Sequence, residues 1–198
     1  MRRRLFDVLA SWVGLIVVVV LLVAGGLLTW GSSVVKSNVH EQLSQQQIYF
    51  PPKAAFEHPK AGTEITPSMI PSVSQYAGKE LLTAAEAKAW ANDFIAVHLS
   101  EMPYHGVYAK VSAASLAEPK NEKLAALVQT VFRGTTLRGL LLEAYGFATI
   151  GEVMMDGAIA CFCLAAIMGL LTFFGFRHAR KVGSDEELMH EAEALAHG

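Results

Sequence analysis

The sequence predicts an all-α membrane protein, in which two transmembrane helices form a hairpin and a helical extracytoplasmic domain lies between them. The first observation is the stretch 157–176, which contains no charged side chain. At about 1.5 Å of rise per residue it is roughly 30 Å long, the thickness of a bilayer's hydrocarbon core. The second is an apolar run from about Val8 to Trp30. The third is that both segments carry basic residues at the ends nearest the chain termini: Arg2, Arg3 and Arg4, then Arg177, Arg180 and Lys181.

The first apolar run is interpreted as a retained helix and not as a cleaved signal peptide. It is longer than the roughly 7–15 residues of a signal's apolar region, and no clear small-x-small cleavage signal follows it. The valine run 17–20 would favour a strand in water, but lipid leaves no partner for unpaired backbone groups, so a helix is expected. Trp12 and Trp30 near the two ends are typical of interfacial anchors.

The basic flanks set the expected orientation, because loops rich in Lys and Arg stay on the cytoplasmic side. Both termini are therefore expected in the cytoplasm. The expected organisation is a cytoplasmic N-terminus (1–7), transmembrane helix 1 (8–30), an extracytoplasmic helical domain (31–150), transmembrane helix 2 (151–176) and a cytoplasmic acidic tail (177–198). In the tail, Ser184 and Glu187 form a second candidate capping box; a solvated helix is expected there, with a docking tail as the alternative.

Small residues recur every four positions in the second apolar segment: Gly157, Cys161, Ala165 and Gly169. Residues four apart lie on one face of a helix, and small side chains let a second helix approach closely in lipid. This face is the predicted helix-packing interface. Its partner is either the first helix of the same chain or another protein, and the alternative explanation is that Gly and Ala are simply common in membrane helices.

The central segment begins with an extension of the first helix and a proline-rich stretch. Residues 36–47 are polar and amphipathic and are expected to prolong the first helix. Residues 51–78 contain five prolines and are predicted to be extended or loop chain without regular helix. Their many apolar side chains are more than a solvated linker needs, so we expect this stretch to lie over a partner's surface.

The rest of the central segment predicts helices. Thr83 and Glu86 form a capping box that opens a helix to about Leu99, and Pro103 ends it. A short helix is expected over 104–117. A further helix begins at residue 121 or 122 and runs to 132, Gly134 interrupts it, and the apolar pattern then resumes and continues into the second transmembrane helix.

Composition excludes several classes of function. The formal net charge of -2 gives no basic footprint for nucleic acid. The only two cysteines, Cys161 and Cys163, are two residues apart in the membrane segment, so they are not expected to form a disulfide, and no Cys-x-x-Cys-His motif for haem is present. Phosphate loops, nucleophile elbows and His-Glu-x-x-His are also missing from the sequence. No cofactor and no catalytic activity are expected.

His98, Glu101 and His105 are the one cluster with metal-ligand residue types. A site on a single helix needs ligands three or four apart on one face, but Pro103 separates Glu101 from His105. They are therefore weak metal candidates, and His98 is interpreted as a histidine at the core or its rim.

Four charged residues are candidates for contacts with a partner or with lipid: Arg133, Arg138, Glu152 and Asp156. Arg133 and Arg138 flank Gly134 and are expected to face carboxylates or lipid headgroups, with partner recognition as the alternative. Glu152 and Asp156 lie one turn apart at the outer end of the second span. Ionisable groups at membrane depth suggest function, whereas solvation at the interface is the simpler explanation for this position.

Three sequence patterns carry a family resemblance: Tyr76-Ala-Gly, Phe94-Ile-Ala-Val-His98-Leu, and Val128-Gln-Thr-x-Phe132-Arg-Gly-x-Thr-Leu-Arg138-Gly-Leu-Leu-Leu. They resemble a family of actinobacterial two-span membrane proteins, many of which carry a ring-opening dioxygenase name although this sequence shows no iron-binding triad. One protein of this build resembles the association factor of the respiratory supercomplex, which joins a cytochrome bcc complex to an aa3-type oxidase. The resemblance implies a bacterial plasma membrane location.

The sequence therefore leads to one main hypothesis and two alternatives. The main hypothesis is a non-catalytic accessory subunit of an integral membrane complex, with the respiratory bcc–aa3 supercomplex as the best single candidate. The first alternative is an extracytoplasmic binding or sensing module tethered by two helices. The second is a membrane-anchored metalloenzyme, which would require His98, Glu101 and His105 to converge within about 2.0–2.2 Å of one metal position.

Overall fold

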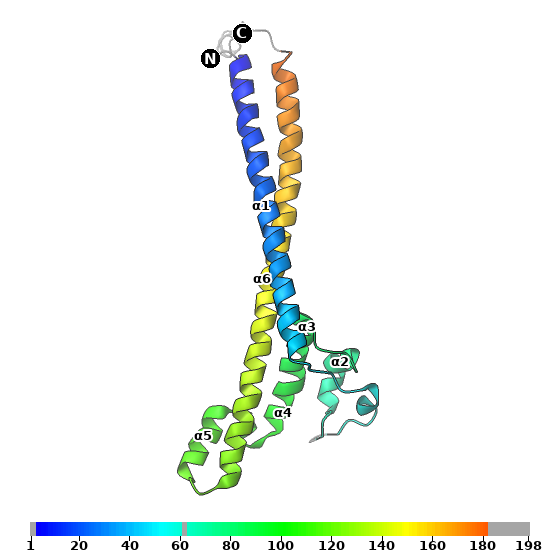
Figure 1. Ribbon diagram of the computed structural model, residues 1–198, viewed down its shortest axis with the longest axis vertical. Helices are drawn as coiled ribbons and strands as arrows, with labels where there is room; N and C mark the ends of the chain where they lie inside the picture. The colour runs from blue at the N-terminus through cyan, green and yellow to red at the C-terminus, as the bar shows by residue number, and fades with distance from the viewer. Residues whose placement is uncertain (1–2, 61–62, 182–198) are drawn as a thin grey trace, which may run out of the picture. The chain divides into compact units, whose positions relative to one another are not determined.

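The structure is a computed structural model that describes residues 3–60 and 63–181. Within these ranges it is helical and has no strand; one isolated antiparallel bridge joins Tyr49 and Glu80. The chain divides into two compact units, and Figure 1 labels the α-helices of both. Unit 1 is formed by the chain up to Ser32 and from Glu152 onward, and unit 2 by Ser33–Gly151.

Two long helices dominate the chain, α1 (Arg3–Gln45) and α6 (Glu122–Ala179). Each contains a stretch that is long and apolar enough to cross a membrane. Only 17% and 11% of the residues in these stretches are buried within the protein, which is the opposite of a core helix in a soluble protein. The predicted all-α class with two long apolar helices is thus confirmed, and so is the extension of the first helix beyond residue 36.

In unit 1 the two apolar segments pack antiparallel. The ring of Trp12, near the start of α1, meets the ring of Phe176, near the end of α6, edge to face with centroids 5.9 Å apart. Further along, Leu28 of α1 lies beside Gly157 of α6. The large apolar side chains point outward from both helices, among them Val13, Ile16, Val20, Val23, Leu27, Ile159, Ile167, Leu170 and Phe173.

The buried positions of unit 1 recur every seven residues. In α6 they are Ala158, Ala165, Thr172 and Ala179; in α1, Ser11, Gly25 and Ser32 are separated by multiples of seven, and Gly14 is buried one turn after Ser11. A seven-residue repeat corresponds to 3.5 residues per turn, the period that keeps one seam facing a partner helix in a left-handed supercoil. All these buried residues are small. We call this strip of small buried residues on α1 and α6 the seam. It allows the two backbones to approach closely, as expected where lipid removes the hydrophobic effect as a driving force for helix association.

Unit 2 contains the predicted capping box. The Thr83 hydroxyl accepts a hydrogen bond from the Glu86 backbone N–H at 3.3 Å, and the Glu86 carboxylate accepts one from the Thr83 N–H at 2.8 Å. The helix then runs as α3 (Ala84–Ala89), a π-helical turn (Trp90–Ile95) and α4 (Ala96–Glu101). It ends at Met102, which is extended before Pro103 as predicted.

The proline-rich stretch differs from its prediction, because it forms several one-turn helices. These are η1 (Lys53–Phe56), η2 (Pro67–Met69), α2 (Ile70–Val73) and η3 (Ser74–Tyr76). Pro67 and Pro71 stand in the first turns of η2 and α2, where a helix needs no N–H donor and the fixed φ of proline suits it. Met69 and Val73 are fully buried, so packing holds these turns in place.

The predicted interruption at Gly134 is wrong, since α6 continues through this residue without a break. A Cβ atom on residue 134 would come within 3.0 Å of the Leu99 side chain, so glycine is present where α4 packs closely against α6. The helix propensity lost with glycine, about 1 kcal/mol, is outweighed by the packing of neighbouring elements.

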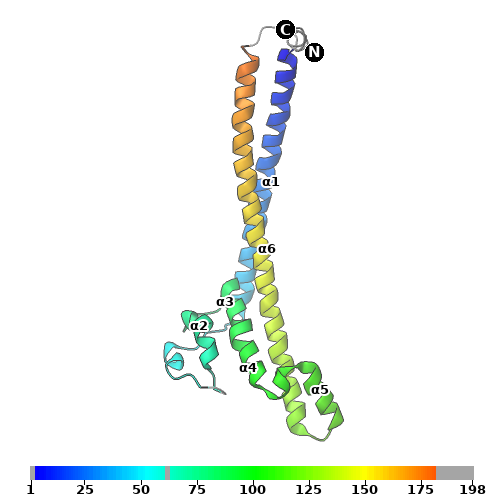
Figure 2. The ribbon, with the colours of Figure 1, turned by 180° about the vertical axis from the view of Figure 1, so that it is seen from behind.

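The helix predicted over 104–117 begins later, as α5 (Tyr108–Ala117). Tyr104, His105 and Gly106 instead form a left-handed turn with φ of 58°, 54° and 62°. This region is uncommon for residues with a side chain and costs them conformational energy. Figures 1 and 2 both show α5 beside the first turns of α6, where Tyr108 and Phe132 have ring centroids 5.9 Å apart.

The core of unit 2 is built around a chain of aromatic rings. Phe50 contacts Tyr76 and Trp90, with centroids 5.1 and 4.9 Å away, and Trp90 stacks on Phe94 at 4.2 Å. The ring of His98 continues the row, 4.6 Å from Phe94. Through these contacts the proline-rich stretch packs against the π-turn of the neighbouring helix. The stretch is therefore part of the domain's own core.

The expected boundaries of the membrane segments stay predictions, because α1 and α6 both continue beyond them without a break. The acidic tail lies outside the described residues from position 182 onward, together with its candidate capping box of Ser184 and Glu187.

Candidate functional site

The predicted ridge of small residues on α6 is split by the structure. Ala165 is buried, and a Cβ on Gly157 would meet only the Leu28 side chain at 3.4 Å, an ordinary contact. Cys161 is half-buried, while a Cβ on Gly169 would meet nothing within 4 Å. Each step of four residues turns about 40° around a helix, so such a ridge drifts away from any one neighbour. The first helix of the same chain thus packs against only part of the ridge. The role of Gly169 stays a prediction.

Two close contacts between α1 and α6 form reciprocal pairs that sequence reasoning missed. A Cβ on Gly14 of α1 would come within 2.5 Å of the Thr172 hydroxyl oxygen, and a Cβ on Gly175 of α6 would come within 2.6 Å of the Ser11 hydroxyl oxygen. In each pair, a hydroxyl side chain of one helix packs against a glycine of the other. The seven-residue spacing of Ala158, Ala165 and Thr172 was the signal in the sequence that could have located this seam.

Two further glycines of α1 receive larger side chains from α6. A Cβ on Gly25 would come within 2.9 Å of the Phe162 ring, and one on Gly31 would collide with the terminal methyl of Met154. Gly26, one residue further, has nothing within 4 Å of its Cβ position. Gly25 and Gly31 thus leave space for particular side chains of α6, whereas Gly26 does not contact α6.

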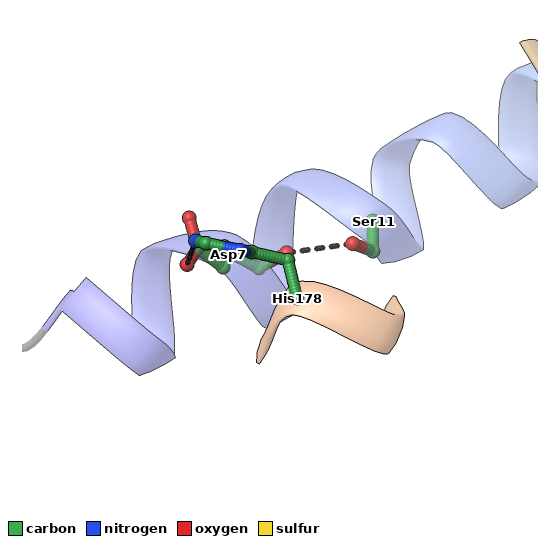
Figure 3. Close-up of polar contacts among 3 residues, drawn as sticks. All are labelled: Asp7, Ser11 and His178. Carbon is green, nitrogen blue, oxygen red and sulfur yellow. Dashed lines mark hydrogen bonds and ion pairs between the residues drawn. The ribbon is translucent and has the colours of Figure 1, made fainter. Parts of the chain in front are cut away.

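A polar group lies at the end of the seam, where α1 begins. Figure 3 shows Asp7 and Ser11 of α1 beside His178 of α6. The Ser11 hydroxyl donates to the Asp7 backbone carbonyl at 2.7 Å, and His178 Nε2 lies 3.9 Å from Asp7 Oδ2. The His178 side chain is 57% exposed, and exposed ion pairs contribute only about 0–1 kcal/mol. Together with residues such as Gly14 and Met168, these residues line an open cavity of about 200 Å³.

The carboxylates of Glu152 and Asp156 are exposed on α6. Asp156 precedes the buried Ala158 by two residues and so projects about 200° around the helix, away from the seam. No ion pair joins either carboxylate to a basic side chain in residues 3–60 or 63–181. They are available to solvent, lipid headgroups or a partner.

The two arginine candidates have different surroundings. Arg133 is exposed, whereas Arg138 is half-buried and donates from Nη2 to the Asn92 side-chain oxygen at 2.9 Å. The Nε of Arg138 is buried and finds no acceptor in the part of the chain that the structure describes. Arg138 thus contacts the π-turn of its own domain and not the expected carboxylate. Sequence reasoning missed Asn92, because a helical pattern does not reveal a π-turn.

The three metal candidates are not brought together. His98 stacks on Phe94, and its Nδ1 lies 2.9 Å from the Phe94 carbonyl oxygen, so this ring nitrogen is already used. His105 belongs to the left-handed turn, and its Nδ1 lies 3.4 Å from the Ser100 carbonyl oxygen. Among the described residues, no group of three or more His, Cys, Asp or Glu side chains is arranged to hold a metal ion.

An open groove of about 470 Å³ lies in unit 2 between the last turns of α1 and the facing part of α6; we call it the interhelical groove. From α1 it is lined by Val35, Asn38, Val39, Gln42, Leu43 and Gln46. From α6 it is lined by Leu137, Leu140, Leu141, Glu143, Ala144 and Phe147. Sequence reasoning missed it, because the two stripes are nearly 100 residues apart in the chain.

Comparison of the chain with protein-family models, with curated proteins and with solved structures gave no match.

Proposed function

We propose that the chain is a non-catalytic accessory subunit of a larger integral membrane complex in a bacterial plasma membrane. Its two apolar segments cross the bilayer as a hairpin, and unit 2 is the extracytoplasmic domain. The partner complex supplies the chemistry, and this chain supplies contacts. The membrane-tethered binding or sensing module is the alternative that a failed test would bring forward.

One observation carries this proposal: in unit 1 the small residues face inward and the large apolar residues face outward. Side chains such as Ile167 and Phe173 are 55% and 60% exposed, although each would be stabilised by about 1.5–3 kcal/mol on burial away from water. An exposed apolar surface of this extent requires lipid or another protein. Since the seam is already closed by the chain's own helices, a partner would bind to the outward faces.

The proposed orientation is supported by the positive charges at the ends of both spans nearest the chain termini. In the sequence, Arg2 to Arg4 precede the first apolar run, and Arg177, Arg180 and Lys181 follow the second. Antiparallel packing of α1 on α6 in unit 1 brings these two basic segments to the same end of the seam. The positive-inside rule then assigns that end to the cytoplasm.

The respiratory bcc–aa3 supercomplex is the first candidate for the partner, and the family resemblance of the segment 76–147 supports this choice. No cofactor of its own is proposed for the chain.

The test is extraction of the native membrane with a mild detergent, followed by pull-down through a tag after residue 198. Mass spectrometry and haem absorbance are measured on the eluate. Cytochrome subunits recovered in a fixed ratio to the chain would support the respiratory assignment. Recovery of the chain alone, or with envelope or signalling proteins, would overturn it and favour the tethered binding module.

A further inference from the structure

The interhelical groove presents an apolar floor to solvent in unit 2. Val39, Leu43 and Leu141 form the floor and are buried, while Leu140 and Phe147 of α6 form an outer wall and remain 58% and 52% exposed. A volume of about 470 Å³ is within the usual range for binding pockets, roughly 300–1,000 Å³. Apolar walls that stay this open are typical of surfaces that another molecule covers.

A hydrocarbon chain from the bilayer is a poor occupant, because charged residues stand at the end of the groove that is nearer to the apolar spans in the sequence. On α1, Lys36 follows immediately after the first lining residue, Val35. On α6, Glu152 and Asp156 stand between Phe147 and the uncharged stretch 157–176. Carboxylates and ammonium groups mark water or headgroup depth and not the hydrocarbon core.

The dimensions of the groove match a helix. From Val35 to Gln46 the wall of α1 extends for about 16 Å, or three helical turns. On α6 the lining residues Leu137, Leu141 and Ala144 recur at spacings of four and three, so they form an apolar stripe on one helix face, which suits a third helix with an apolar stripe of its own. Asn38, Gln42 and Gln46 form a row of neutral amides along one rim, which can donate to or accept from a polar helix flank.

Charge identifies the chemistry of that helix. Glu143 is the charged residue of the lining, and it is exposed opposite the row of amides. We infer that the interhelical groove binds an amphipathic helix of the partner complex, with an apolar stripe of about three turns and a Lys or Arg that faces Glu143. This inference rests on the proposed function, because it names the docking site for the same partner.

The test places a photo-cross-linking amino acid at position 42, on the rim of the groove, in the full-length tagged chain in native membranes. Position 41 is the matched control, because Glu41 is exposed on the same helix but does not line the groove. We expect a cross-link from position 42 to one helical peptide of a co-purifying subunit, at least tenfold stronger than that from position 41. The peptide should contain the apolar stripe and a basic residue.

Two pairs of variants test the contacts. Leu140→Asp and Glu143→Lys should each reduce the cross-link from position 42 at least fivefold. Leu116→Asp on α5 and Glu57→Lys immediately after η1 alter exposed residues outside the groove and should leave the cross-link unchanged. Recovery of the folded chain from the membrane is measured for each variant, so that loss of folding is separated from loss of docking.

Several results would overturn the inference. A cross-link from position 42 to a second copy of the chain, or to lipid alone, would assign the groove to another occupant. Equal cross-links from positions 41 and 42 would mean that the groove is not a specific site. If the partner complex co-purifies and no cross-link forms at position 42, the proposed function stands and the inference fails; if nothing co-purifies, both fail.

Discussion

The hydroxyl oxygen of Thr172 on α6 lies so close to Gly14 on α1 that a Cβ atom on residue 14 would be 2.5 Å from it. The reverse contact, Ser11 against Gly175, is almost equally close. Interlocking of this kind fixes both the distance between the helices and their register. Dispersion and close approach are what hold helices together in lipid.

Enlarging a seam glycine should therefore destabilise unit 1. We expect Gly14→Leu to lower the free energy of unfolding in detergent micelles by about 1–3 kcal/mol, the usual effect of overpacking. Gly169→Leu is the matched control, because its Cβ would meet nothing within 4 Å, and its stability should be unchanged. Equal destabilisation of both variants would contradict the claim that Gly14 lies at a close helix contact and Gly169 does not.

The same pair of variants separates packing within the chain from packing against a partner. If Gly169 contributes to an external interface, Gly169→Leu should reduce co-purification of the partner complex while membrane insertion and stability are kept. The measurement is the ratio of partner to tagged chain in the eluate. An unchanged ratio would remove Gly169 from any external interface.

The capping box of α3 should contribute measurably to the stability of unit 2. Thr83→Ala removes the acceptor for the Glu86 N–H and should cost about 0.5–2 kcal/mol in denaturant unfolding. Thr149→Ala serves as the control, because its exposed hydroxyl bonds only to the Tyr145 carbonyl of its own helix. A loss no larger than that of the control would show that the cap is not needed.

The left-handed turn before α5 predicts a difference between two glycines. Gly78 and Gly106 both have positive φ, 73° and 62°, and alanine is disfavoured there by about 1–2 kcal/mol. A Cβ on residue 106 would also collide with the backbone carbonyl of Leu99, whereas residue 78 has open space. Gly106→Ala should therefore lower the melting temperature much more than Gly78→Ala; similar shifts would refute this explanation.

The bond between Arg138 and Asn92 should hold the π-turn against α6. We expect Asn92→Ala to destabilise the chain by about 1–3 kcal/mol, because it leaves a half-buried guanidinium with fewer acceptors. A double-mutant cycle with Arg138→Met measures the coupling between the two side chains. Additive effects of the two substitutions would mean that the contact contributes nothing.

Local signals in the sequence were sufficient for part of the fold. The Thr83 capping box and the stop at Pro103 depend on neighbouring residues alone, so both could be predicted. The continuity of α6 through Gly134 could not, because its reason is the Leu99 side chain from another helix. The turns in the proline-rich stretch likewise depend on the burial of their own side chains, such as Met69, against residues from other parts of the chain.

The candidate site could likewise be predicted only in part, because some of its features depend on residues distant in the chain. A four-residue ridge pointed to the correct helix but only partly to the correct face, since the seam follows a seven-residue repeat shared with α1. The repeat is present in α6 at Ala158, Ala165 and Thr172, but the sequence does not show that these residues face α1. Asn92 and the interhelical groove depend on a π-turn and on two segments distant in the chain, which periodicity within one segment cannot detect.

The most direct test of the central claim is the molar ratio of this chain to cytochrome subunits in a complex purified through the tag from native membranes. An accessory subunit predicts a fixed ratio that stays constant through a second, size-based purification step and coincides with the haem absorbance. A ratio that falls toward zero at the second step, with the chain recovered free of haem, would contradict the account.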